Sequence, residues 1–328
     1  MSGNWDGLQR LWYGISPLHL LLVPLSALFY LLSATRRQLY RLGIFRSVRL
    51  PVPVIVVGNI TVGGSGKTPL TLWLAQQLIA QGFRPGIVSR GFGGSNVTPQ
   101  PALPDSSPDS VGDEPVLMAQ RGLCPVWVGR DRPAAAQTLL QAHPECDVII
   151  SDDGLQHYRL QRDVEIVVVD GVRRFGNGWL LPAGPLREPV ARLRNVDAVV
   201  VNGGSAGHNE YPMQLLGEKF HNLRQLTRIA SAADFAGQQP HALAGIGHPE
   251  RFFGHLRQMG LTPRTHAFPD HYRYRAEDMA FGDAAPILMT EKDAVKCRAF
   301  APEQCWALRV DAQVDFSLIQ HILKKIRP

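Results

Sequence analysis

The chain has 328 residues, 45% of them hydrophobic and 19% charged, which is the composition of a globular protein long enough for about two domains. Its net charge of +6 is concentrated at the N-terminus: residues 1–50 contain six arginines and one aspartate, which leaves a net charge of only +1 for the remaining chain. A nucleic-acid-binding surface over the globular part is therefore not favoured. The four cysteines form no C-x-x-C pair and no Cys/His cluster with zinc spacing, so we expect reduced thiols in a cytosolic domain.

The first predicted element is an apolar N-terminal helix. Leu11–Thr35 carries no formal charge and is long enough for a bilayer span, which needs about 20 residues. Pro17, His19 and Pro24 argue against a regular span, and no A-x-A-like cleavage site marks a signal peptide. We expect a membrane-attached helix that dips into the interface or lies in it, with a full span and a purely internal helix as the alternatives.

A run of arginines follows this helix without an acidic residue among them. Each could gain about 1 kcal/mol near an anionic cytoplasmic leaflet, and positive flanks stay on the cytoplasmic side. We therefore expect residues 1–50 to form a membrane-associated segment that keeps the globular part in the cytosol. The arginines are Arg36, Arg37, Arg41, Arg46 and Arg49.

A phosphate-binding loop is predicted next. Val54–Val57 is typical of a buried strand, and the glycine-rich turn after it matches G-x-x-x-x-G-K-[ST] except that Thr61 takes the place of the first glycine. Backbone N–H groups of such a turn surround an anion, Lys67 adds a positive charge, and Thr68 has the hydroxyl expected on Mg²⁺. The alternative is a glycine-rich turn without a ligand. The predicted nucleotide-binding residues are Thr61, Val62, Gly63, Gly64, Ser65, Gly66, Lys67 and Thr68.

From residue 51 the sequence alternates between short apolar strands and helices. This pattern predicts a parallel sheet covered by helices on both faces, with ligands at the carboxyl ends of the strands. Asn96 to Ser110 interrupts it as an irregular loop rich in proline and serine. The predicted elements are helix 68–81, strand 86–89, helix 112–122, strand 125–128, helix 133–142, strand 147–150 and strand 164–169.

A second alternating set predicts a second, smaller α/β domain. We place the domains at residues 1–50, 51–163 and 164–328, with the last elements free to return to the first α/β domain. The elements of this set are strands 198–201 and 241–246, helix 249–259, strands 287–289 and 306–310, and a closing helix that ends near residue 325.

Two acidic pairs are the candidates for chemistry on the nucleotide. Asp152 and Asp153 follow an apolar strand, where a hard oxygen ligand for Mg²⁺ is expected, although Asp-Asp-Gly also suits a turn. Asp113 and Glu114 open a predicted helix; they either favour its dipole or include a general base for an attacking hydroxyl.

Other polar residues carry weaker signals. Asp270 and His271 are adjacent and cannot pair with each other, and a distant carboxylate partner for His271 is invisible in the sequence. Thr290-Glu-Lys-Asp293 faintly resembles the base-reading motif of GTPases without its asparagine, and a polar strand–helix turn explains it equally well. Loop arginines suit phosphate recognition or remain solvated surface charges; these are Arg90, Arg130, Arg132 and Arg187.

Taken together, these motifs resemble the tetraacyldisaccharide 4′-kinase family, the membrane-associated kinases of lipid A biosynthesis in Gram-negative bacteria. The resemblance runs from the apolar N-terminus to about residue 297, and family members also carry threonine at the position of Thr61. Phe92 stands where many members have tyrosine. The motifs are Pro53–Pro69, Ser89–Gly94, Gly112–Pro115, Gly129–Arg132, Ser151–His157, Leu181–Glu188, Phe268–Tyr272 and Thr290–Lys296.

The resemblance implies that the γ-phosphate of ATP passes to the 4′-hydroxyl of an acylated glucosamine disaccharide 1-phosphate. It implies Lys67 and Thr68 on the phosphates and Mg²⁺, Asp113 as the base and His271 as its orienting partner. It further implies metal or supporting roles for Glu114, Asp152 and Asp153, and phosphate or substrate contacts for Gln156, Arg90, Arg130, Arg132 and Arg187.

The implied partners are the lipid acceptor and the cytoplasmic face of the bacterial inner membrane, with no nucleic acid and no obligate protein partner. Two other hypotheses stay open: a membrane-tethered nucleotide switch, and a soluble P-loop ligase whose apolar N-terminus packs internally.

Overall fold

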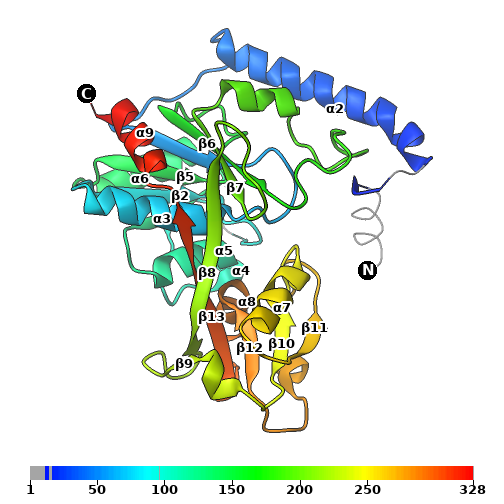
Figure 1. The fold of residues 1–328 in the computed structure, drawn as a ribbon. Helices are drawn as coiled ribbons and strands as arrows, with labels where there is room; N and C mark the ends of the chain where they lie inside the picture. The colour runs from blue at the N-terminus through cyan, green and yellow to red at the C-terminus, as the bar shows by residue number, and fades with distance from the viewer. Residues whose placement is uncertain (1–11, 15–16, 96, 328) are drawn as a thin grey trace.

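One sheet runs through the whole molecule. The structure is a computed structural model that describes residues 12–14, 17–95 and 97–327. Its 13-stranded sheet has the order β11-β10-β12-β13-β8-β7-β6-β1-β5-β2-β4-β3, and β9 pairs with β8. Two lobes share this sheet, and the long strands β8 (Tyr211–Asn222) and β13 (Cys305–Val314) connect them (Figure 1).

The first lobe is the larger α/β unit. Its central strand β1 (Val54–Gly58) is buried along its whole length and pairs in parallel with two neighbours. Ile55 and Val57 face one apolar core, which is covered by α3, α5 and α9, whereas Val54 and Val56 face the other, which is covered by α6. The predicted parallel sheet with helices on both faces is therefore confirmed.

Most elements of the first lobe follow the predicted order with small shifts in their bounds, but the predicted irregular loop contains a short strand at Gln100–Pro101 and most of a short helix at Pro108–Val111. The strands are β2 (Pro85–Ser89), β3 (Gln100–Pro101), β4 (Val126–Val128), β5 (Val148–Asp152), β6 (Val164–Asp170) and β7 (Ala198–Asn202). The helices are α3 (Lys67–Ala80), α4 (Pro108–Val111), α5 (Asp113–Gln120), α6 (Arg132–Ala142), a 3₁₀ turn Val190–Asn195, and α9 (Ser317–Ile326).

The second lobe is built on parallel strands around β12. Strand β12 (Ile287–Thr290) pairs with β13 and with β10 (His241–Ala244), which pairs with β11 (Arg264–Ala267). Its helices are α7 (Pro249–Gln258), α8 (Glu291–Cys297) and 3₁₀ turns at Ala232–Phe235 and Ala276–Met279, and β9 (Ile229–Ser231) lies at its end.

Residues 164–202 continue the sheet of the first lobe, because β6 pairs directly with β1 and β7 pairs with β6. Apolar residues of α9 also join the core beside α3, so the chain returns to the first lobe at its end. We therefore propose that the domain boundary follows β8 and β13 rather than residue 164. These two strands pair antiparallel, with a bulge between Arg309 and Asp311.

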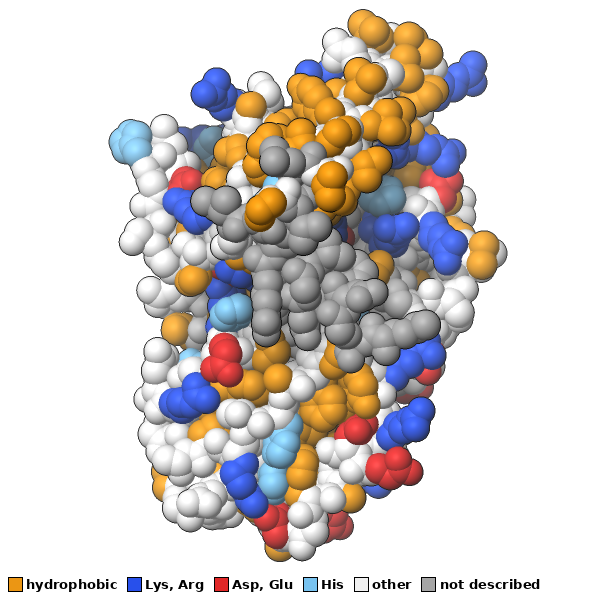
Figure 2. All heavy atoms as spheres, turned by 90° about the vertical axis from the view of Figure 1, so that its right-hand side faces the viewer, with side chains coloured by type: hydrophobic (Ala, Val, Ile, Leu, Met, Phe, Trp, Pro, Cys, Tyr) orange, Lys and Arg blue, Asp and Glu red, His pale blue; other side chains and the backbone are white. Residues whose placement is uncertain are grey.

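Helix α2 (Leu18–Arg41) lies along the first lobe and contains Pro24. Ser26 Oγ donates to Leu180 O at 2.9 Å and accepts from Ala183 N at 3.0 Å, so a polar face of the helix packs on the protein. The opposite face is apolar, and Figure 2 shows the apolar side chains gathered over it. Its exposed leucines are Leu21, Leu25, Leu28, Leu31 and Leu32.

Within the described residues, no helix has the length and apolar character that a membrane crossing requires. Residues 1–11 and 15–16 of the predicted membrane segment, and Asn96 of the irregular loop, lie outside the described residues.

Candidate active site

The predicted phosphate loop joins β1 to α3 as expected. Gly63 and Gly66 have φ of 97° and 95°, a region that glycine enters without strain. A Cβ on Gly66 would lie 2.4 Å from Asn202 Nδ2, which donates to Ser65 O at 3.0 Å. Thr61 needs no such freedom, because it forms an antiparallel bridge with the strand-like segment at residues 185–186. This pairing explains why threonine replaces the first glycine.

Lys67 lies at the start of α3 and points to the carboxyl end of β5. Its Nζ is 3.6 Å from Asp153 Oδ1, and Arg187 Nη1 is 3.5 Å from the same oxygen. Burial would raise the pKa of Asp153, but the charges of Lys67, Arg187 and Arg132 lower it below its usual value. Asp153 is thus an anion paired with Lys67 and Arg187, and a bound phosphate would compete with it for both side chains.

Asp152 is an unsatisfied acid at the end of β5. Its Oδ1 accepts from Thr71 Oγ1 at 3.1 Å, whereas its buried Oδ2 has no hydrogen-bond partner among the described residues. Burial, followed by the charges of Glu114 and Asp153, raises the pKa of Asp152 to about 7. A buried carboxylate oxygen that lacks a donor and lies near two other acids fits a cation.

The surrounding donors suit Mg²⁺. Within the described ranges, no three His, Cys, Asp or Glu side chains converge into a complete metal cage. Mg²⁺ does not need one, because it commonly takes one or two carboxylates and completes its shell with phosphate oxygens and water. The oxygens of Thr68, Glu114, Asp152 and Asp153 therefore fit the ion as a partial set.

Asp113 and His271 meet across the two lobes. Asp113 starts α5 directly after Gly112, and His271 lies on the loop that follows β11. His271 Nδ1 is 3.2 Å from Asp113 Oδ2. Burial would raise the pKa of Asp113, but the neighbouring His271 and the charge of Lys292 hold it below its usual value. The structure therefore brings His271 to Asp113, the carboxylate partner that the family resemblance implied.

Lys292 is the main site residue that the sequence analysis missed. Its Nζ lies 3.2 Å from Glu114 Oε1, 3.5 Å from Asp270 Oδ1 and 3.9 Å from Asp113 Oδ2. Burial alone would lower the pKa of Lys292, but these three acids raise it well above its usual value. Lys292 Nζ also lies 3.4 Å from His271 Nε2.

The signal for Lys292 was the predicted polar strand–helix turn. Thr290 caps α8 by accepting from Asp293 N at 3.2 Å, and Asp293 in turn accepts from Gly245 N at 3.1 Å. This turn directs Lys292 toward α5. The residues therefore serve as a helix start that positions a cation, and the asparagine that a base-reading motif requires is absent.

The predicted substrate residues separate into two groups. Arg90 and Arg130 are exposed beyond β2 and β4, and Gln156 Nε2 donates to Asn59 O at 3.1 Å and to Glu188 Oε1 at 2.8 Å. Arg132 is different, because it is fully buried.

The guanidinium of Arg132 donates to Gly129 O at 2.7 Å and to Asp152 O at 3.4 Å. Burial lowers its pKa to about 10 despite the nearby charges of Asp152 and Asp153. We therefore correct the expectation for Arg132: it supports the loops after two strands from inside and does not face a substrate.

Comparison with known proteins places this geometry in a family. The family model described as tetraacyldisaccharide-1-P 4′-kinase (LpxK) matches residues 18–327. The chain is 53% identical over 319 residues to a tetraacyldisaccharide 4′-kinase of Methylobacillus flagellatus, covering 97% of this chain and 95% of that protein. It is 50% identical over 328 residues to one from Nitrosococcus oceani, covering 100% and 96%.

A solved structure agrees with this assignment. The crystal structure of LpxK from Aquifex aeolicus, described as an "apo" form in complex with ATP, superimposes with a TM-score of 0.79 at 28% sequence identity. The match covers 94% of this chain and 99% of that one. Sequence, fold and site together show that this chain belongs to the tetraacyldisaccharide 4′-kinase family.

Proposed function

We propose that this chain transfers the γ-phosphate of ATP to the 4′-hydroxyl of tetraacyldisaccharide 1-phosphate, a step of lipid A biosynthesis. The observation that carries the proposal is the contact of Asp113 with His271 beside the phosphate loop. A phosphate loop alone indicates a nucleotide, whereas a base with an orienting partner indicates that a hydroxyl is activated next to it.

The phosphate end of the reaction is assigned to the first lobe. Backbone N–H groups of residues 61–68 surround the phosphates, and Lys67 exchanges Asp153 for phosphate oxygens when ATP binds. Thr68, Asp152 and Glu114, with Asp153 beside them, would hold Mg²⁺, which when bound neutralises charge on the transferred phosphoryl group.

The acceptor end is assigned to Asp113. At neutral pH its lowered pKa keeps it ionised, so it is able to accept the hydroxyl proton. His271 Nδ1 contacts the carboxylate, and Lys292 contacts both His271 and Glu114. Because phosphoryl transfer depends more on position and charge than on base strength, a weak but well-placed base suffices. Arg90, Arg130, Arg187 and Gln156 are the proposed phosphate and acceptor contacts.

We place the enzyme at the cytoplasmic face of the inner membrane. A four-chain lipid rarely leaves a bilayer, and the exposed leucines of α2 next to a run of arginines suit an interfacial helix. Leu25→Asp with Leu32→Asp should release the full chain from vesicles, because both side chains point away from the protein. Gln38→Asp, on the same helix and also exposed, is the matched control. Retention of the double variant on vesicles would contradict the placement.

Labelled ATP and the detergent-dispersed lipid acceptor test the reaction. We expect label in the lipid, and no label when either the lipid or Mg²⁺ is omitted. Release of inorganic phosphate without labelled lipid would instead favour the nucleotide switch.

A further inference from the structure

A polar cavity lies away from the phosphate loop, beneath the C-terminal end of α2. Its volume is about 320 Å³. Five of its lining residues are arginines and one is a glutamate; the lining consists of Arg37, Tyr40, Arg41, Arg49, Tyr158, Leu160, Gln161, Arg162, Glu165, Arg192 and Asn195. Nothing in the proposed transfer step uses this cavity.

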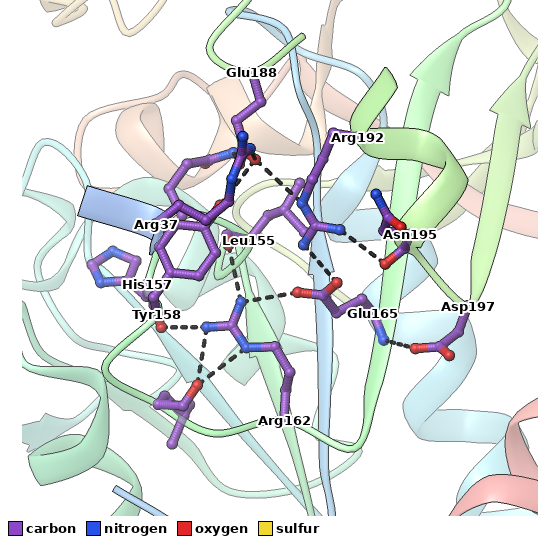
Figure 3. A network of polar contacts seen from close by, with 12 residues as sticks. Arg37, Leu155, His157, Tyr158, Arg162, Glu165, Glu188, Arg192, Asn195 and Asp197 are labelled. Atoms are coloured by element: carbon purple, nitrogen blue, oxygen red, sulfur yellow. Dashed lines mark hydrogen bonds and ion pairs between the residues drawn. The ribbon is translucent and has the colours of Figure 1, made fainter. Parts of the chain in front are cut away.

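The inner wall of the cavity is held together by a network of hydrogen bonds and ion pairs (Figure 3). The side chain of Arg192 is only 4% exposed; Nη2 donates to Glu165 Oε2 at 2.6 Å, and Nη1 donates to Asn195 O at 3.0 Å. Arg162 donates to the other oxygen of Glu165 at 3.1 Å. Guanidinium groups held in this way lose little conformational freedom when an anion binds.

The cavity has more cations than its structural contacts require. Arg162 and Arg192 pair with Glu165, and Arg37 and Arg192 pair with Glu188. The pair of Arg37 with Glu188 attaches α2 to the first lobe. Arg49 pairs with Asp163 at 3.0 Å, but its side chain is 69% exposed.

Arg41 forms no ion pair within the described part of the chain. The five lining arginines of the cavity and the three carboxylates that contact them leave a formal charge of +2. A purely structural salt-bridge cluster would not need this surplus at its open side.

The rim of the cavity is apolar. Leu42, Ile44 and Phe45 follow Arg41 directly and are all exposed. Tyr40 packs on Phe45 and on Tyr158, with ring centroids 5.3 and 6.0 Å apart. A basic cavity with an exposed apolar rim matches a ligand that carries both an anion and hydrocarbon, and a free phosphate ion would gain nothing from the rim.

We propose that this cavity binds the phosphate head group of an anionic membrane phospholipid, whose acyl chains lie over Leu42, Ile44 and Phe45. The assignment rests on the proposed placement of α2 at the membrane. A bound lipid fixes the C-terminal end of α2 on the bilayer, and Glu188 connects that end to Gln156 near the phosphate loop.

Flotation of the full chain on vesicles tests the proposal. The vesicles are phosphatidylcholine alone, or phosphatidylcholine with a fifth of phosphatidylglycerol. Arg41→Gln with Arg49→Gln removes the two outer cavity arginines, both of which are exposed. Arg36→Gln with Arg46→Gln removes the same charge from exposed positions of the same segment outside the cavity.

If the arginines act only through general attraction to an anionic surface, both double variants lose affinity by a similar factor. We expect the cavity pair to lose at least tenfold more affinity for the phosphatidylglycerol vesicles than the outer pair does, with no such difference on phosphatidylcholine alone. Equal losses in the two pairs overturn the proposal.

The lipid acceptor also carries a phosphate and hydrocarbon chains, so it is the other ligand whose chemistry fits this cavity. In micelles of neutral detergent that contain the lipid acceptor and no phospholipid, a tenfold rise in KM for the cavity pair alone assigns the cavity to the acceptor and overturns the phospholipid proposal. Wild-type transfer in those micelles tests the proposed kinase reaction separately, because no phospholipid is present.

Discussion

The two lobes hold their site residues in different ways. In the first lobe, Asp152 is fully buried at the end of a central strand, and Lys67 starts a helix packed on the same sheet. In the second lobe, Asp270 and His271 lie on a loop, and His271 has a φ of 58°, a strained value for a residue other than glycine. The comparison indicates that the phosphate end is built into the sheet, whereas the acceptor end is complete only while the lobes are close.

The largest effect should come from removing the base at the acceptor end. Asp113→Asn should reduce transfer to the lipid by about 10² to 10⁴-fold, as loss of a general base does. ATP affinity, measured by calorimetry, should stay within a few-fold, because the phosphate end is intact. A comparable loss of ATP affinity would mean that the two ends are not separate.

Removing the cation at the phosphate end should affect binding and transfer together. Lys67→Ala should lower the transfer rate by roughly 10² to 10³-fold, because charge on the transferred phosphoryl group loses its stabilisation. It should also weaken ATP binding. Lys325→Ala, a surface lysine paired with Asp197, is the control. A loss below tenfold would mean that the phosphate loop has been misidentified.

The contribution of the second lobe can be isolated through Lys292. Lys292→Met should lower kcat by about 10 to 100-fold, because Asp113, Glu114 and His271 lose their common partner. Lys292→Arg should restore part of it.

Arg121→Met is the matched control for Lys292. Arg121 also bridges the lobes, with Nη2 2.7 Å from Glu291 Oε2, but it contacts no residue of the acceptor end. Equal losses of kcat in the Lys292 and Arg121 variants would assign Lys292 to lobe contact alone.

The smallest expected effect is a gain in thermal stability when the buried carboxylate of Asp152 is removed. The unfolded chain ionises Asp152 near pH 3.8, whereas the folded chain does so only at about 7. Between these values the unfolded state holds fewer protons, so the ligand-free protein loses stability as the pH rises through this window. Asp152→Asn should raise the melting temperature by a few degrees, more at pH 8 than at pH 5.

The exposed Asp105→Asn is the comparison for this measurement. The Asp152 variant should also lose transfer activity, since it alters a proposed Mg²⁺ ligand. A gain in melting temperature of the same size at pH 5 and pH 8 would exclude titration of Asp152 as its cause.

The sequence predicted the first lobe well because its signals are local. A buried β-branched strand, a glycine-rich turn and Gly-Lys-Thr specify the phosphate loop within sixteen residues, Val54–Pro69. Alternating apolar strands and helices were sufficient to predict the parallel sheet. The same local patterns placed Asp113 at a helix start and Asp152 at a strand end.

The remaining features depend on contacts between distant segments. His271 and Lys292 reach Asp113 only through the docking of the two lobes, which no local pattern in the sequence encodes. Strand β8 was missed because it is half-exposed and contains Pro212 and Gly217, which weaken a strand pattern. The sequence Gly129–Arg132 gives no means of telling that Arg130 is exposed and Arg132 is buried.

The connection between the lobes has a mechanical consequence. It is a ribbon of two antiparallel strands, β8 and β13, and the bulge beside Arg309 places its carbonyl 2.6 Å from where a Cβ on Gly217 would lie. Such a ribbon twists and bends easily but does not stretch, because its hydrogen bonds fix the register. We expect the lobes to rotate relative to each other about this ribbon without sliding along it. Each closure then returns His271 and Lys292 to the same position beside Asp113.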